Sequence, residues 1–156
     1  MSKSMKRVEL ALAASGLSAD ILEMTAETRT AQQAAEAAGC ALDQIAKSII
    51  FKGENSGHVV LFITAGGNRV SAKRASAVAG QALGKADADL IRAETGFAIG
   101  GVAPIGHLTP VESYFDPRLL EFERVYAAAG TPRHIFSIDP AALLKMTGAQ
   151  TAEFTE

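Results

Sequence analysis

The stretch that most constrains the fold is residues 100–107, Gly-Gly-Val-Ala-Pro-Ile-Gly-His, which places three glycines and a proline inside an apolar run. Glycine adopts backbone angles closed to other residues and lets main chain approach a ligand, whereas proline stiffens a turn and removes a donor. The pattern therefore predicts a shaped loop rather than the interior of a strand or helix. That loop is either a pocket wall or a turn between buried strands, and it lacks the glycine spacings of phosphate-binding loops.

A second constraint is Lys47, which opens a β-branched and aromatic run over residues 47–51 that predicts a strand. Because side chains alternate along a strand, Lys47 shares one face with Ile49 and Phe51. The lysine either lays its stem along this apolar surface with its amine in water, or it meets a partner there.

The length of 156 residues and the 48% apolar content predict a single domain spanning residues 1–156, with a core that needs no disulfide or metal. Cys40 is the only cysteine, and the sequence has neither CxxC nor HExxH, so neither a disulfide framework nor a zinc site is indicated. The basic N-terminus leads into a short apolar run that contains Glu9. This pattern is not typical of a signal peptide or a membrane span, and we expect a cytoplasmic protein.

The net charge of −2 argues against a protein that coats duplex DNA, because such binding grows with the number of phosphates neutralised. One local cluster of cations, Arg69, Lys73 and Arg74, lies at the start of a predicted helix. Helix N-terminal amides and cations together suit a phosphate. The cluster is therefore either a phosphate contact or a solvated helix face.

Capping residues, hydrophobic periodicity and glycine stops predict the other elements. Helices are expected over residues 3–14, 30–38, 71–79 and 90–94 and from 140 onward, and strands over 21–24, 47–51, 58–64, 111–115, 122–127 and 134–138. Residues 86–89 are ambiguous. Since strands and helices do not alternate regularly, the pattern indicates an α+β fold rather than a doubly wound sheet.

In combination these features resemble the YbaK/aminoacyl-tRNA deacylase family, the free-standing relatives of the editing domain of bacterial prolyl-tRNA synthetases. The resemblance is carried by residues 30–35, 46–48, 66–71, 95–97, 100–106 and 139–148. It implies a mixed, strongly curved, open-barrel-like β-sheet flanked by helices. It also implies a hydrolase that releases amino acids wrongly esterified to tRNA.

The resemblance also implies roles for particular residues. Lys47 matches a near-invariant lysine of the family, and residues 100–104 match its pocket loop. Asp116 either aligns with an acidic residue of related deacylases or caps the following turn, and His107 is either a site residue or a structural one. The expected catalytic residues are Lys47, Gly100 and Gly101; the expected substrate-binding residues are Val102, Ala103, Pro104, Ile105, Gly106, His107 and Asp116; and the expected tRNA contacts are Arg69, Lys73 and Arg74.

An aminoacyl ester is already activated, so an editing enzyme mainly has to orient the carbonyl and stabilise the developing oxyanion. We therefore expect substrate-assisted hydrolysis without metal or cofactor, acting on the acceptor end of a mischarged tRNA, alone or with a synthetase as partner. Ala103 makes the loop less polar and favours a small apolar or thiol side chain, such as alanine or cysteine on tRNA-Pro. The competing interpretation is a non-catalytic tRNA- or synthetase-binding or regulatory module of the same fold.

Overall fold

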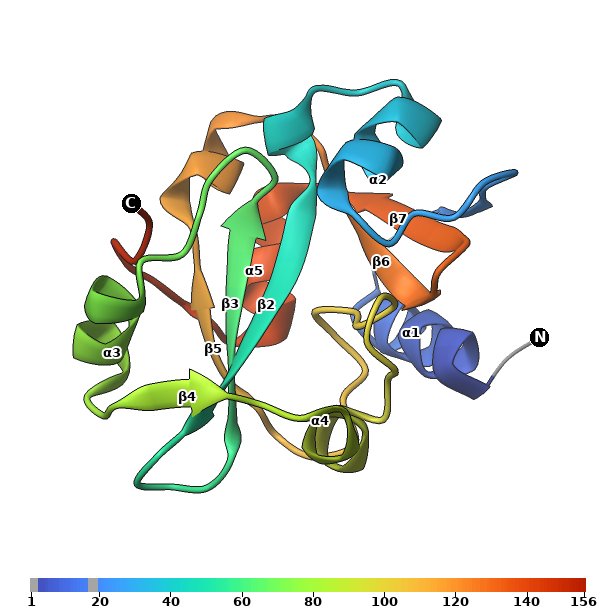
Figure 1. Cartoon of the computed structure of the whole chain (residues 1–156). Helices are drawn as coiled ribbons and strands as arrows, with labels where there is room; N and C mark the ends of the chain where they lie inside the picture. The colour runs from blue at the N-terminus through green and yellow to red at the C-terminus, as the bar shows by residue number, and fades with distance from the viewer. Residues whose placement is uncertain (1–2, 17–19) are drawn as a thin grey trace.

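The computed structural model describes residues 3–16 and 20–156, whose strands form two sheets (Figure 1). The larger sheet has the order β4 (Leu83–Lys85), β2 (Ala46–Gly53), β3 (Val59–Ala65), β5 (Glu112–Phe115) and β8 (Gln150–Thr151). The smaller sheet consists of β1 (Ile21–Glu23), β7 (His134–Ile138) and β6 (Val125–Thr131). The helices are α1 (Lys3–Ala14), α2 (Ala31–Ala38), α3 (Ala72–Ala79), α4 (Ala88–Thr95) and α5 (Pro140–Thr147), with 3-10 turns η1 (Leu42–Gln44) and η2 (Pro117–Glu121).

The larger sheet is mixed, because β2 runs antiparallel to β3 and β4 whereas β5 runs parallel to β3 and β8 runs parallel to β5. A parallel bridge between Ile45 and Tyr126 joins the two sheets at the start of β2. From this bridge β2 and β6 spread apart (Figure 1). The α+β prediction is confirmed. The prediction of one strongly curved, open-barrel-like sheet is not, since the strands divide into two sheets that join at this bridge.

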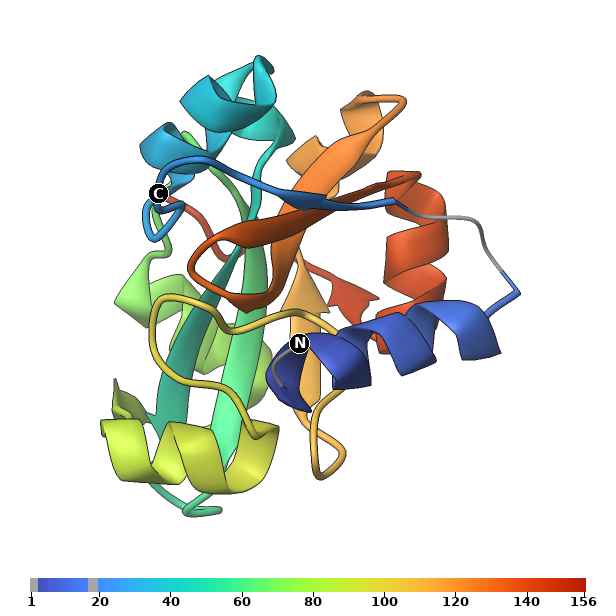
Figure 2. The same ribbon diagram turned by 90° about the vertical axis from the view of Figure 1, so that its right-hand side faces the viewer.

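The core lies on both faces of β3, whose seven residues are all buried. On one face Leu61 and Ile63 pack with Phe115, Phe136 and Leu143, beneath α1 and α5 (Figure 2). On the other face Phe62 packs with Val60, Tyr114, Phe154 and Ala75 of α3, and its ring stacks on Tyr114 at 5.4 Å between centroids. Burial on both faces explains why β3 is a continuous apolar run rather than an alternating one.

Local capping signals set most helix ends. Thr30 accepts from Gln33 N, and the Gln33 side chain accepts from Thr30 N, which makes a capping box at the start of α2. Gly39 ends that helix with φ +70°. Helix α4 begins two residues before the predicted 90, because the carboxylate of Asp87 caps the N–H of Leu90.

Within the part of the chain that the structure describes, no helix is both long and apolar enough to span a membrane.

Candidate functional site

A cavity of about 520 Å³ lies where β2 and β6 spread apart. Its walls come from β2, from β6, from the segment that enters α2 and from the loop that follows α4. Much of the lining is apolar, including Ile91, Val102, Ala127 and Ile135. The volume is in the range of small-molecule binding sites in proteins.

The glycine-rich loop meets this cavity through Ile99, Gly100 and Val102. Gly100 has φ +95°, which favours glycine, and a Cβ there would lie 2.7 Å from Nη1 of Arg29. Gly101 does not line the cavity, and its N–H donates to the carbonyl of Ala98 at 3.1 Å. Gly101 therefore shapes the turn, whereas the main chain of Gly100 lies on the cavity wall.

The second half of the loop, residues 103–107, does not line this cavity. Ala103 is fully buried in the core. Its four successors, Pro104, Ile105, Gly106 and His107, line a different hollow of about 570 Å³ that also involves α1 and the end of α5. The structure thus brings Val102, but not residues 103–107, to the cavity beside β2.

His107 forms a hydrogen bond within the glycine-rich loop. Its Nε2–H donates to the carbonyl of Ala103 at 2.8 Å, and its ring packs edge-on against Phe97. Burial lowers the pKa of His107, and the bond to Ala103 opposes that effect only in part. A neutral imidazole therefore joins the two ends of the segment 103–107.

Lys47 lines the same cavity as Gly100, from the start of β2. Its neighbours Ile49 and Phe51 pack in the cluster around Phe62, which confirms the predicted apolar face. Its Nζ donates to the carbonyl of Gly66 at 3.1 Å, at the turn that follows β3. Burial, and secondly the positive charge of Arg69, lower the pKa of Lys47, against the opposing effect of Asp116 and Asp43.

Asp116 lies outside the cavity but supports this corner of it. The carboxylate is buried, and it accepts hydrogen bonds from Ala65 N at 3.1 Å, from Asn68 Nδ2 at 2.9 Å and from Arg118 N at 2.9 Å. Asp116 therefore caps η2, which is one of the two roles considered from the sequence. It also fixes the turn whose Gly66 carbonyl accepts the bond from Lys47.

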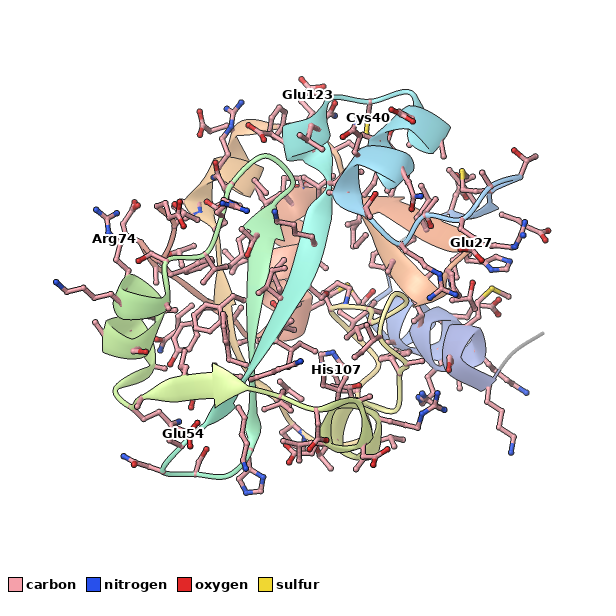
Figure 3. The ribbon with its side chains drawn as sticks, in the orientation of Figure 1. Glu27, Cys40, Glu54, Arg74, His107 and Glu123 are labelled. Atoms are coloured by element: carbon pink, nitrogen blue, oxygen red, sulfur yellow. The ribbon has the colours of Figure 1, made fainter. Side chains whose placement is uncertain are left out.

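Of the cations expected to contact tRNA, Lys73 and Arg74 belong to the first turn of α3 and Arg69 lies shortly before it. Arg69 is exposed and is close enough to Lys47 to lower its pKa. Arg74 donates to the carbonyl of Thr155 and points outward from α3, across β2 and β3 from α2 (Figure 3). Arg69, Lys73 and Arg74 are not among the residues that line the cavity. The cations that do line it are Arg29, Lys47 and Lys85.

One edge of β2 is open toward the cavity. Gly53 N donates to His58 O, in register with the β2–β3 ladder, so the odd-numbered residues of β2 hydrogen-bond to β3. The N–H and C=O groups of Ser48 and Ile50 consequently point to the other edge. There β4 begins to pair only at Phe51, and both residues line the cavity.

Sequence reasoning did not single out Ser48, Arg29 or Lys85. The Oγ of Ser48 is buried and has no hydrogen-bond partner among the described residues. Arg29 and Lys85 are each a lone cation, Arg29 in a polar stretch and Lys85 between Gly84 and Ala86, and no spacing relates either of them to Lys47. Within residues 3–16 and 20–156, no group of three His, Cys, Asp or Glu side chains is arranged to hold a metal.

A family model and a solved structure point to the same kind of domain. The family model described as "Aminoacyl-tRNA editing domain" matches residues 25–146. A solved structure described as a candidate trans-editing enzyme for prolyl tRNA synthetase is 44% identical, with a TM-score of 0.92, covering 100% of this chain and 99% of that one.

Two sequence relatives are more distant. The uncharacterized protein YwhH of Bacillus subtilis is 32% identical over 124 residues, which are 80% of this chain and 78% of YwhH. EbsC of Enterococcus faecalis, named as a candidate Cys-tRNA(Pro)/Cys-tRNA(Cys) deacylase, is 26% identical over 126 residues, which are 81% of this chain and 77% of EbsC.

Proposed function

The chain belongs to the family of aminoacyl-tRNA editing domains, and from this premise we propose that it hydrolyses the ester between a small, wrong amino acid and a tRNA. The proposed first substrates are alanine and cysteine on tRNA-Pro. The observation that carries the proposal is that Lys47 and Gly100 line one cavity with a largely apolar interior. A cavity that combines a cation with an apolar lining suits a ligand with a small apolar side chain and a negatively charged phosphate backbone.

The proposed oxyanion contacts come from main chain. Gly100 and Val102 line the cavity, and their N–H groups donate to no other described residue. As water attacks the ester carbonyl, these donors can stabilise the negative charge that develops on its oxygen. The ribose oxygen then leaves as a hydroxyl by taking up a proton, and the free amino acid is released. Gly101 contributes through the turn it closes with Ala98.

We propose that Lys47 binds the acceptor end of the tRNA and holds it in position. An ammonium has three donors, and Gly66 accepts only one of them. The remaining donors can pair with the terminal phosphate, which sets the register of the ester against Gly100. Asp116 acts through Lys47, because it holds the turn that carries Gly66.

The other predicted site residues have indirect roles in this proposal. Ala103, Pro104, Ile105, Gly106 and His107 maintain the shape of the loop behind Gly100 and Val102. Arg69 adds positive charge beside Lys47, and Lys73 and Arg74 contact tRNA farther from the ester. A synthetase that delivers the tRNA is a proposed partner.

The apolar lining sets the expected order of substrates. We place the substrate side chain against Ile91, Val102 and Ile135, which offer no side-chain hydrogen bond to a hydroxyl, and away from the unpartnered Oγ of Ser48. Alanine and cysteine should then be preferred over serine. An apolar pocket rejects an added hydroxyl only weakly, by about a hundredfold at most. Serine should therefore be released more slowly rather than not at all.

The test is a panel of tRNAs charged with alanine, cysteine, serine, threonine or proline. The proposal predicts catalytic release of alanine and cysteine from tRNA-Pro, and a loss of at least about tenfold in kcat/KM for Lys47→Gln. The control is Lys145→Gln, an exposed lysine of α5, which should match the wild type. If the protein bound these tRNAs but released no amino acid from them, the proposed hydrolase activity would be contradicted, and the chain would be a binding module instead.

A further inference from the structure

The charged residues that line the cavity are all cations. Arg29, Lys47 and Lys85 contribute, and none of the described residues that line the cavity is Asp or Glu. The chain as a whole has more acidic than basic residues, 17 against 15. This segregation of charge, within a protein of negative net charge, favours an anionic ligand in the cavity.

Lys85 is the cation at the far end of β2 from Lys47. It ends β4 and lies opposite Phe51 in the β2–β4 ladder. Its side chain is exposed, and it forms no ion pair with a described residue. Its three donors are therefore available to a ligand that leaves the cavity at this end.

The guanidinium of Arg29 lies against the glycine-rich loop at the cavity wall. Its Nε pairs with Oε2 of Glu27 at 2.9 Å, and both side chains are about half exposed, at 49% and 48%. Its Nη1 lies against Gly100, where a Cβ would come within 2.7 Å. Glu27 engages only one of the five guanidinium donors, so the others remain free beside the proposed ester site.

Lys47 and Lys85 are too far apart to serve one phosphate. Lys47 and Phe51 are four residues apart on β2, which is about 13 Å at the usual rise of a strand. The Lys47 amine reaches toward Gly66, beyond the Ala46–Ala65 pair, and so leans away from Lys85. Two separate anionic groups of one ligand would fit this spacing.

We propose that Arg29 and Lys85 form, together with Lys47, a binding track for successive phosphates of the single-stranded 3′ end of a tRNA. The protein then recognises more than the terminal nucleotide. This inference rests on the proposed function for the identity of the ligand. Lys47 binds the phosphate nearest the ester, and Lys85 binds one farther along the strand.

The test is the affinity for short RNAs taken from the 3′ end of tRNA, measured by fluorescence anisotropy with three probes: the terminal adenosine nucleotide, CCA and a five-nucleotide RNA that ends in CCA. The wild type should bind the longer probes more tightly than the single nucleotide. In Lys85→Gln and Arg29→Gln that gain should shrink by at least about threefold, and the slope of log affinity against log salt should fall by about 0.7 for each lost contact. The matched control Lys145→Gln should bind every probe as the wild type does.

The binding track and the proposed hydrolysis can be refuted independently of each other. If Lys85→Gln and Arg29→Gln bind the longer probes as tightly as Lys145→Gln, and with an unchanged salt slope, the two cations are merely solvated and the track is refuted. Because the probes carry no amino acid, this result does not depend on hydrolysis. A wild type that binds them with the expected length dependence but releases no amino acid refutes only the editing reaction.

Discussion

Replacing Asp116 by asparagine tests how the corner around Lys47 is held together. The carboxylate is buried and accepts hydrogen bonds from Ala65, Asn68 and Arg118. An asparagine has one acceptor oxygen in place of two, so its NH₂ group must face either the N–H of Ala65 or that of Arg118. Asn68 can rotate its own amide, but a backbone N–H cannot, and one donor loses its acceptor in either orientation.

A buried donor without an acceptor costs about 1–3 kcal/mol, so we expect Asp116→Asn to lower the free energy of unfolding by about 2 kcal/mol. Urea unfolding at pH 7 measures the loss directly. With a denaturant slope of about 1–3 kcal/mol/M for a domain of this size, the midpoint should fall by roughly 1 M.

The matched control is Asp139→Asn, at the N-cap of α5. Asp139 is exposed and accepts from Ala141 N, and asparagine caps a helix about as well as aspartate. This control should therefore unfold close to the wild-type midpoint. If Asp116→Asn were no less stable than Asp139→Asn, the carboxylate would not hold the turn, and its support of Lys47 would have to be abandoned.

Three further predictions concern Gly100 and the lowered pKa values of His107 and Lys47. Gly100→Ala and Gly57→Ala both force alanine to a positive φ, so each should lower the free energy of unfolding by about 1–2 kcal/mol in thermal unfolding. Only Gly100→Ala should also slow deacylation. If the two variants deacylated tRNA at the same rate, the role of Gly100 would be contradicted. Since the pKa of His107 is lowered on folding, its stabilising effect is complete above about pH 6.5 and is lost as the pH falls, so the wild type should lose more stability between pH 7 and pH 5 than His107→Gln. Asp116→Asn should lower the pKa of Lys47 further, and an unchanged ¹⁵Nζ titration would refute the proposed coupling.

Local signals account for what the sequence predicted well. The bounds of α1, the extent of α2, the start of α5 and the strands β2 and β3 all depend on residues within a few positions of one another. The short strands β4 and β8 were missed because two or three residues carry little pattern of their own. They are strands because β2 and β5 supply their hydrogen-bond partners.

The division into two sheets could not be read from the sequence for a related reason. Strand pairing is a long-range property, and the bridge between Ile45 and Tyr126 joins residues far apart in the chain. The prediction for the site had the same limit. Residue types indicated Lys47 and the glycine loop, but only the fold shows that the loop turns Gly100 toward β2 and His107 toward α1 and α5.

The most direct test of the proposed site is an NMR titration with a non-hydrolysable alanyl-adenosine, in which an amide replaces the ester. We predict that the backbone amides of Gly100, Val102 and Ser48 shift together as the analogue fills the cavity between β2 and β6. Shifts confined to Gly106, His107 and their neighbours in α1 and α5 would place the ligand in the other hollow. That result would contradict the assignment of the editing site to the cavity that Lys47 and Gly100 share.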